Sequence, residues 1–121
     1  MTGLELSFRH RRGSFGLDVT LTLPASGLTA VFGPSGAGKS SLLRAIAGFD
    51  RTCGRISLNG EVWEDGHFFL PPHRRRVGFV FQDPRLFAHL DVAGNLLYAA
   101  RRGGGVQALN QMVRDFQLEL L

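Results

Sequence analysis

The fold of this chain is decided by residues 33–40, which read GPSGAGKS. In the pattern G-x-x-x-x-G-K-[ST], Gly36 and Gly38 let the backbone turn its N–H groups inward around a phosphate. Lys39 is the single lysine among the 121 residues, and its compact ammonium fits a tight phosphate loop better than a planar guanidinium does. The stretch therefore predicts a loop that binds the triphosphate of a nucleotide, which we expect to be ATP with Mg²⁺.

The residues on either side of this loop have the patterns of a strand and a helix. Residues 28–32 form a short apolar run, as in a strand buried on both faces. After Lys39 the apolar residues recur at helical spacing up to Gly48, which is placed to end the helix. Because a helix N-terminus attracts anions, this order favours phosphate binding over a glycine-rich turn without a ligand.

We expect every residue of the loop and its first extension to contact the nucleotide. These cofactor-binding residues are Gly33, Pro34, Ser35, Gly36, Ala37, Gly38, Lys39, Ser40 and Ser41. Lys39 would bridge the β- and γ-phosphate oxygens, the Ser40 hydroxyl would be a Mg²⁺ ligand, and Ser41 would donate to the α-phosphate.

Period-two alternation of apolar residues predicts an antiparallel β-lobe built from four short segments. The segments are residues 4–8, 15–23, 55–58 and 61–63. Asn59-Gly60 is a two-residue turn of the kind that closes a hairpin. Residues 77–81 are a second apolar run of the buried type, so that with residues 28–32 they predict a parallel core sheet. The expected fold class is α/β, with the antiparallel lobe beside this core.

Two helices are predicted in the last third of the chain. Asp91 is placed to cap the first, and a run of three glycines at 103–105 separates it from a helical pattern over residues 106–121. The apolar side of the last helix consists of Leu109, Met112, Val113 and Phe116. We expect that side to lack a packing partner, as if the chain stopped before its fold does.

The composition excludes several classes of protein. The net charge is +4 and the isoelectric point about 10.6, but the basic residues are spread along the chain, so we expect no nucleic-acid partner. The run Arg74 to Arg76 is interpreted as solvated charge without a site. No apolar run approaches the ~20 residues of a membrane span, and no signal peptide is present. Cys53, the single cysteine, is expected to be a small, buried or half-buried thiol.

Two stretches carry a family resemblance that covers most of the chain. Residues 33–49, GPSGAGKSSLLRAIAGF, resemble the Walker A region of ABC-transporter ATPases. Residues 77–101, VGFVFQDPRLFAHLDVAGNLLYAAR, resemble the Q-loop region of that family. The phrases LNGEVWED, LFAHLDV and GNLLYA are most similar to ATPase subunits of molybdate importers. The resemblance implies a P-loop ATPase of the ABC type that powers import of an oxyanion, with molybdate favoured.

The resemblance also assigns roles outside the glycine loop. Gln82 matches the Q-loop glutamine, which makes it a catalytic residue with Lys39 and a Mg²⁺ ligand with Ser40. Leu86, Phe87 and Leu90 match the surface that receives the transmembrane permease subunits. The alternative is that these three residues pack against the helix that begins near Asp91. A second ATPase subunit, expected to be a copy of this chain, is implied, as is a peripheral location on the cytoplasmic side of the inner membrane.

The chain departs from the family pattern in two respects. The loop between the first two strands lacks the tyrosine on which adenine usually stacks, and Phe15 or the guanidinium of Arg12 would have to replace it. The signature LSGGQ, the Walker B carboxylates and the switch histidine are absent, and family order places them after Leu121. We therefore expect residues 1–121 to be the N-terminal portion of an ATPase domain, inactive alone. Residues 1–82 would be its nucleotide-binding core with the β-lobe, and residues 83–121 its Q-loop and the start of a helical subdomain.

Three alternatives remain open at this point. Asp83 follows an apolar run and could be a Walker B carboxylate, as in a small-molecule kinase. A DNA-repair ATPase of the same superfamily would carry a coiled-coil or zinc insertion. A non-catalytic nucleotide-binding module is the third reading, and the residues encoded after Leu121 would distinguish it from an ATPase.

Overall fold

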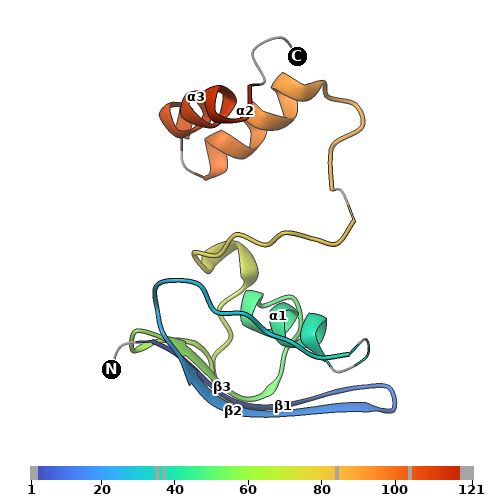
Figure 1. The fold of residues 1–121 in the computed structure, drawn as a ribbon. Helices are drawn as coiled ribbons and strands as arrows, with labels where there is room; N and C mark the ends of the chain where they lie inside the picture. Colours follow the sequence, from blue (N-terminus) through green and yellow to red (C-terminus); the bar gives the residue numbers. More distant parts are fainter. Residues whose placement is uncertain (1–2, 35, 37, 84, 104, 118–121) are drawn as a thin grey trace. The chain divides into compact units, whose positions relative to one another are not determined.

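The computed structural model describes residues 3–117 apart from 35, 37, 84 and 104. The chain divides into two compact units, Met1–Phe79 and Val80–Leu121. The first unit holds a four-stranded sheet and one α-helix, and the second holds two helices (Figure 1).

The sheet of the first unit is antiparallel throughout, as the alternating sequence predicts. Its strands are β1 Leu4–Arg12, β2 Phe15–Leu23, β3 Cys53–Leu58 and β4 Glu61–Glu64, in the order β2-β1-β3-β4. Asn59 and Gly60 join β3 to β4 with φ values of +51° and +85°, which confirms the predicted hairpin turn. The Asn59 side chain also accepts a hydrogen bond of 2.8 Å from the Gly3 amide, so this turn is tied to the start of β1.

Helix α1, Lys39–Ala47, covers the apolar face of the sheet (Figure 1). The buried core between them consists of Leu6, Phe8, Val19, Ala45, Ile56 and Trp63. Gly48 ends the helix at φ +88°, with its amide directed to the carbonyls of the last turn, as predicted. A short 3₁₀ turn, η1 Pro72–Arg74, follows the sheet.

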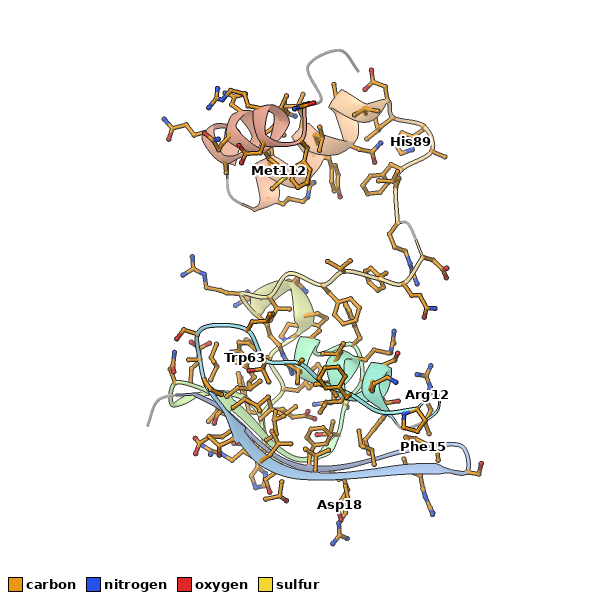
Figure 2. All side chains as sticks on the ribbon, in the orientation of Figure 1. Arg12, Phe15, Asp18, Trp63, His89 and Met112 are labelled. Atoms are coloured by element: carbon orange, nitrogen blue, oxygen red, sulfur yellow. The ribbon has the colours of Figure 1, made fainter. Side chains whose placement is uncertain are left out.

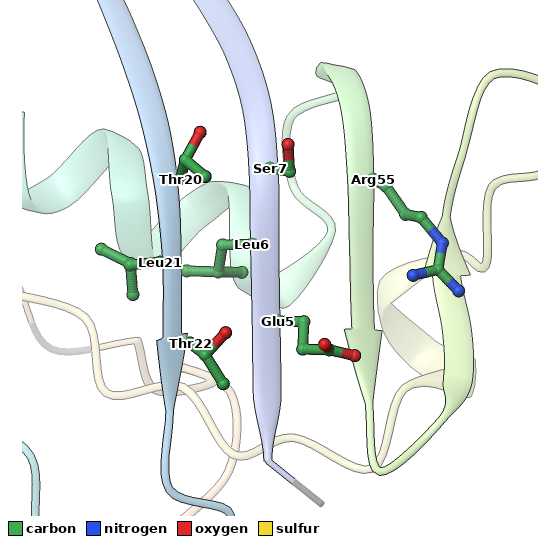
Figure 3. A pocket seen from close by; sticks show the side chains of 7 residues that line it. All are labelled: Glu5, Leu6, Ser7, Thr20, Leu21, Thr22 and Arg55. Carbon is green, nitrogen blue, oxygen red and sulfur yellow. The ribbon is translucent and has the colours of Figure 1, made fainter. Parts of the chain in front are cut away.

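The opposite face of the sheet is polar. Figure 3 shows a shallow groove there, about 220 Å³ in volume, whose lining includes Glu5, Ser7, Thr20, Thr22 and Arg55. These side chains alternate along their strands with the apolar residues of the other face. The alternation therefore explains why α1 packs on one face only.

The two apolar runs, residues 28–32 and 77–81, were predicted as parallel strands but do not form strands. Residues 28–32 and 77–81 are irregular, with Phe32 90% and Val80 95% exposed. A parallel strand is stable only when neighbouring strands pair with its edges and helices cover its faces, and no described segment does this for either run. The described residues of runs 28–32 and 77–81 therefore do not form the predicted parallel core sheet.

Two further predictions need correction. Cys53 is exposed rather than buried, because it begins β3 in register with the exposed Arg9 on the polar side of the sheet. Arg75 is not solvated like Arg74 and Arg76 but buried, and its guanidinium donates hydrogen bonds to four backbone carbonyls. Spacing in the sequence does not reveal such carbonyl acceptors, because they come from other elements.

The second unit is a pair of packed helices, α2 Val92–Arg102 and α3 Gly105–Asp115. Asp91 caps α2 as predicted, since its carboxylate accepts a 2.7 Å hydrogen bond from the Gly94 amide. Leu109 lies in an apolar groove between the helices, so the apolar side of α3 does have a partner, although Met112 and Phe116 stay exposed. The predicted continuation of α3 over residues 118–121 lies outside the described residues.

A cluster of charged side chains fixes the chain just beyond α1. Arg44 donates two hydrogen bonds of 3.1 Å to the carboxylate of Asp50, and His10 Nε2 lies 3.7 Å from the same carboxylate. The hydrogen bond from Arg44 lowers the pKa of Asp50 below its ordinary value of 3.8, and the charges of Arg12 and His10 add to this effect. Asp50 therefore links the end of the helix to β1.

Replacement of Asp50 by asparagine should lower the free energy of unfolding by about 1–2 kcal/mol at neutral pH, because a hydrogen-bonded charge pair is lost. A carboxylate whose pKa is lowered on folding stabilises the fold above its unfolded pKa and loses that effect as the pH falls through the folded value. The deficit should therefore shrink as the pH falls below 3.8 and vanish only below the folded pKa of Asp50, which lies lower still. Denaturant titration followed by the fluorescence of Trp63 measures it.

Asp18→Asn is the matched control, because Asp18 pairs with Arg9 at 3.5 Å while both side chains are exposed. This variant should change the stability little at any pH. Equal losses in Asp18→Asn and Asp50→Asn, or a loss in Asp50→Asn that persists in acid, would contradict the assigned role of the cluster.

Candidate nucleotide-binding site

The glycine loop lies between β2 and α1 in the first unit. Of its predicted site residues, Gly33, Pro34, Gly36 and those from Gly38 onward are described, whereas Ser35 and Ala37 lie outside the described residues. Gly36 and Gly38 have φ values of +85° and +96°, in the left-handed region that glycine adopts without strain. Backbone of this kind can turn amide groups inward around an anion.

The ammonium of Lys39 is folded back into this loop. Its Nζ donates hydrogen bonds to the carbonyl oxygens of Gly33 and Pro34, the latter at 3.2 Å. An ammonium has three donors and prefers charged oxygen acceptors to neutral carbonyls. A phosphate bound in the loop would therefore lie beside the Lys39 ammonium, which the loop carbonyls already hold in place.

The N-terminus of α1 has backbone amide donors that could bind an anion. Gly38 occupies the N-cap position without a side-chain hydrogen bond, and the first turn of the helix carries no acidic residue. The amides of a first helical turn lack intrahelical partners, and the helix dipole adds partial positive charge to them. Ser40 is exposed on this turn, and Ser41 is half-buried beside it.

The two residues predicted to meet the base lie on the β1–β2 hairpin. Arg12 and Phe15 are directly opposite each other where β1 ends and β2 begins, and Figure 2 labels both. The Phe15 ring packs against Gly38, since a Cβ there would lie 2.8 Å from the Phe15 Cζ and 3.2 Å from Leu17 Cδ1. Phe15 therefore supports the N-cap of α1, a role that the sequence did not suggest.

Gln82 belongs to the second unit, whereas Lys39 and Ser40 belong to the first, so Gln82 is described separately from them. Gln82 and its neighbour Asp83 are both exposed and lie in irregular chain. The reading of Asp83 as a Walker B carboxylate requires a buried strand before it, and residues 77–81 do not form one.

The predicted permease surface of the second unit divides into two kinds of residue. Leu86 is 76% exposed. Phe87 instead packs edge-to-face on Tyr98, with ring centroids 4.5 Å apart, and Leu90 is half-buried. The packing alternative therefore describes one side of the Phe87 ring, which stays 41% exposed, and Leu86 is the more exposed of the two.

Asn95 organises this surface, and the sequence reasoning missed it. Its Oδ1 accepts from the Phe87 amide at 2.8 Å, and its Nδ2 donates to the carbonyls of Phe87, Leu90 and Asp91 at 2.9–3.2 Å. Asparagine is a weak helix former, and its place in the first turn of α2 was the one available signal of a special role.

Comparison with known proteins agrees with this geometry. Residues 17–120 match the family described as ABC transporter. The chain belongs to the ABC transporter family. This confirms the resemblance of the glycine loop and Q-loop stretches to ABC ATPases, and it places the chain among P-loop proteins with an antiparallel sheet.

The similar curated proteins are named as molybdenum import ATP-binding proteins. The chain is 50% identical over 115 residues to the molybdenum import ATP-binding protein ModC of Rhodopseudomonas palustris (strain HaA2), covering 94% of the chain and 30% of that protein. It is 50% identical over 123 residues to molybdenum import ATP-binding protein ModC 1 of Azotobacter vinelandii, covering 98% and 33%. The chain thus spans about a third of the length of these relatives. None of the helices in the described part of the chain combines the length and the apolar character needed to cross a membrane.

Gly38→Ala should weaken Mg-ATP binding about tenfold or more. Its Cβ would meet the Phe15 ring at 2.8 Å, and a left-handed conformation outside glycine costs about 1–3 kcal/mol. Titration with a fluorescent ATP analogue measures the change. Gly66→Ala is the control, because its Cβ would enter open space and no positive φ is involved. Equal affinities in the two variants would show that the loop geometry does not govern binding.

Proposed function

We propose that this chain is the nucleotide-binding part of an ABC-type ATPase subunit that powers the import of an oxyanion, with molybdate as the favoured solute. The observation that carries the proposal is the Lys39 ammonium held inside a glycine loop at the uncapped N-terminus of α1. The family match supports ATP as the nucleotide, and the relatives named for molybdenum import support the solute.

The described loop residues from Gly36 onward each have a task in this proposal. The amides around Gly36 and Gly38 bind the β-phosphate, and Lys39 offsets charge on the β- and γ-phosphate oxygens. Ser41 donates to the α-phosphate. Ser35 and Ala37 complete the loop in sequence, and they lie outside the described residues.

The Ser40 hydroxyl and the Gln82 amide oxygen are hard oxygen donors of the kind that fit Mg²⁺. They would hold the ion, with phosphate oxygens supplying further ligands. Mg²⁺, when bound, draws electron density from the phosphate oxygens and neutralises charge that develops there. Gln82 would in addition orient the attacking water.

Hydrolysis requires more than these residues supply. Phosphoryl transfer also needs a group that orients or activates water and a donor facing the γ-phosphate from the opposite side. We propose that a second ATPase subunit, a copy of the same protein, completes each site. Residues 1–121 would then be the N-terminal portion of the ATPase domain, able to bind Mg-ATP weakly and unable to hydrolyse it alone.

The exposed apolar runs fit the same proposal. Residues 28–32 and 77–81 would be strands of a parallel core sheet in the whole protein, where further strands and helices would cover them. Leu86, with Phe87 and Leu90 beside it, would contact the transmembrane permease subunits at the cytoplasmic face of the inner membrane. A small-molecule kinase or a DNA-repair ATPase would share the glycine loop with an ABC ATPase. No other observation favours either of these two functions.

Lys39→Ala should weaken Mg-ATP binding at least a hundredfold, because charge-assisted contacts to two phosphates, each worth about 1.5–3 kcal/mol, are lost. Lys39→Arg should fail as well, since a planar fork does not fit where a point charge is held. Calorimetric titration measures both, and Arg11→Ala removes one exposed cation as a control. Unchanged affinity in Lys39→Ala would overturn the proposed function.

Leu86→Asp should reduce co-purification of the full-length protein with its permease subunits about tenfold or more, because burial of a leucine is worth about 1.5–3 kcal/mol and an aspartate there would be desolvated. Met112→Asp changes another exposed apolar residue of the same unit and should have no effect. The reverse pattern would place the permease contact on α3.

A further inference from the structure

We infer that Arg75 is a positioning residue of the proposed nucleotide site, whose buried guanidinium holds the C-terminal end of α1 and the start of the segment that leads to Gln82 in one frame. The inference rests on the proposed function. Arg75 touches neither the nucleotide nor the metal in that proposal. It would act on binding only through Lys39, Ser40 and Gln82, which do touch them.

The guanidinium of Arg75 is almost fully buried and donates four hydrogen bonds. Arg75 is 3% exposed. Its Nη1 donates to the carbonyls of Ala45 and Ile46 at 3.1 and 2.9 Å, within the last turn of α1. Its Nε donates to the Leu70 carbonyl at 2.7 Å, and its Nη2 donates to that of Trp63 at 3.3 Å. One side chain thus joins the end of α1 to β4 and to the loop after β4.

The surroundings of the guanidinium are built to receive it. Its centre lies 5.6 Å from the ring centroid of Trp63 and 5.0 Å from that of Phe69, both in cation–π range. A Cβ at Gly48 would come within 2.8 Å of the Arg75 Nε and Cζ. The glycine that ends α1 therefore also makes the room in which the guanidinium lies. Burial lowers the pKa of Arg75, and the charge of Glu64 opposes this shift.

Because Arg75 binds the C-terminal end of α1, it also affects the position of the glycine loop at the other end of the helix. The last carbonyls of a helix lack intrahelical partners and carry partial negative charge. A cation at this end donates hydrogen bonds to these carbonyls and offsets their negative charge. Lys39 and Ser40 begin the same nine-residue helix, about 8–10 Å along its axis from the carbonyls that Arg75 binds. Because a helix this short moves as a rod, fixing its C-terminal end limits the positions that Lys39 can take.

The residues after Arg75 are held against the same end of α1. The Val77 amide donates to the Arg75 carbonyl at 2.8 Å, and the Phe79 ring packs edge-to-face on Phe49 with centroids 5.0 Å apart. Phe49 follows Gly48 directly, and Phe79 precedes Gln82 by three residues. The base of the segment that carries Gln82 is thus anchored where the helix of Lys39 ends.

The test is a comparison of two affinities in the purified full-length protein. Arg75→Met should lower the preference for Mg-ATP over metal-free ADP about tenfold, because the γ-phosphate and metal contacts depend on both anchored parts. Arg75→Lys keeps a buried charge but has too few donors in the right plane, so it should lower the preference about threefold. Arg74→Met and Arg76→Met change exposed neighbours and should leave both affinities as they are.

A double-mutant cycle separates positioning from mere stability. Gln82→Ala should lower the same preference, and Arg75→Met should lower it little further in the Gln82→Ala background. Additive losses, or equal weakening of Mg-ATP and ADP by Arg75→Met, would show that Arg75 only stabilises the fold and would overturn the inference. If Arg75→Met does not fold, as judged by Trp63 fluorescence, Arg75→Lys takes its place in the cycle. Failure of the proposed function is distinct, because it would appear as unchanged ATP affinity in Lys39→Ala.

Discussion

The packing of α1 on the apolar face of the sheet is the interaction on which the candidate site depends. Ala45 is fully buried against Leu6, Phe8 and Ile56, and its small side chain lets the helix backbone come close to the strands. Once the axis of the helix is fixed, its N-terminus has one position, and the glycine loop must reach it from the end of β2. The left-handed conformations of the loop glycines are the consequence, because no other residue makes those reversals without strain.

Charge is distributed so that the two ends of α1 differ. The N-terminal end has Lys39 and free amides, with no acidic residue in the first turn, whereas the C-terminal end is surrounded by arginines with defined partners. Arg44 is paired with the carboxylate of Asp50, and Arg75 is stabilised by hydrogen bonds to carbonyl oxygens. Lysine at one end and arginine at the other follow from geometry: a phosphate loop needs a small, movable charge, and several fixed carbonyls need a rigid fork of donors.

The features that could be predicted from the sequence are those that local chemistry determines. The Asn59-Gly60 turn, the glycine that ends α1 and the Asp91 cap each depend on a few adjacent residues, and all three are as expected. The features that could not be predicted depend on residues far apart in the chain. Arg75 looked like its exposed neighbours because its acceptors are carbonyls of other elements. The apolar run ending at Phe32 looked like a strand, yet strand formation also requires neighbours that its own sequence does not encode.

The central claim is that the Lys39 ammonium exchanges loop carbonyls for nucleotide phosphates. Lysine-selective isotope labelling of this chain reports on that one side chain, because Lys39 is its only lysine. The most direct measurement is the NMR signal of the Lys39 ε-methylene and ammonium groups during a titration with Mg-ATP. The account predicts that the signal shifts to a new position that saturates with binding, and that adenosine has no such effect. A Lys39 signal that stays unchanged at saturating Mg-ATP would contradict it.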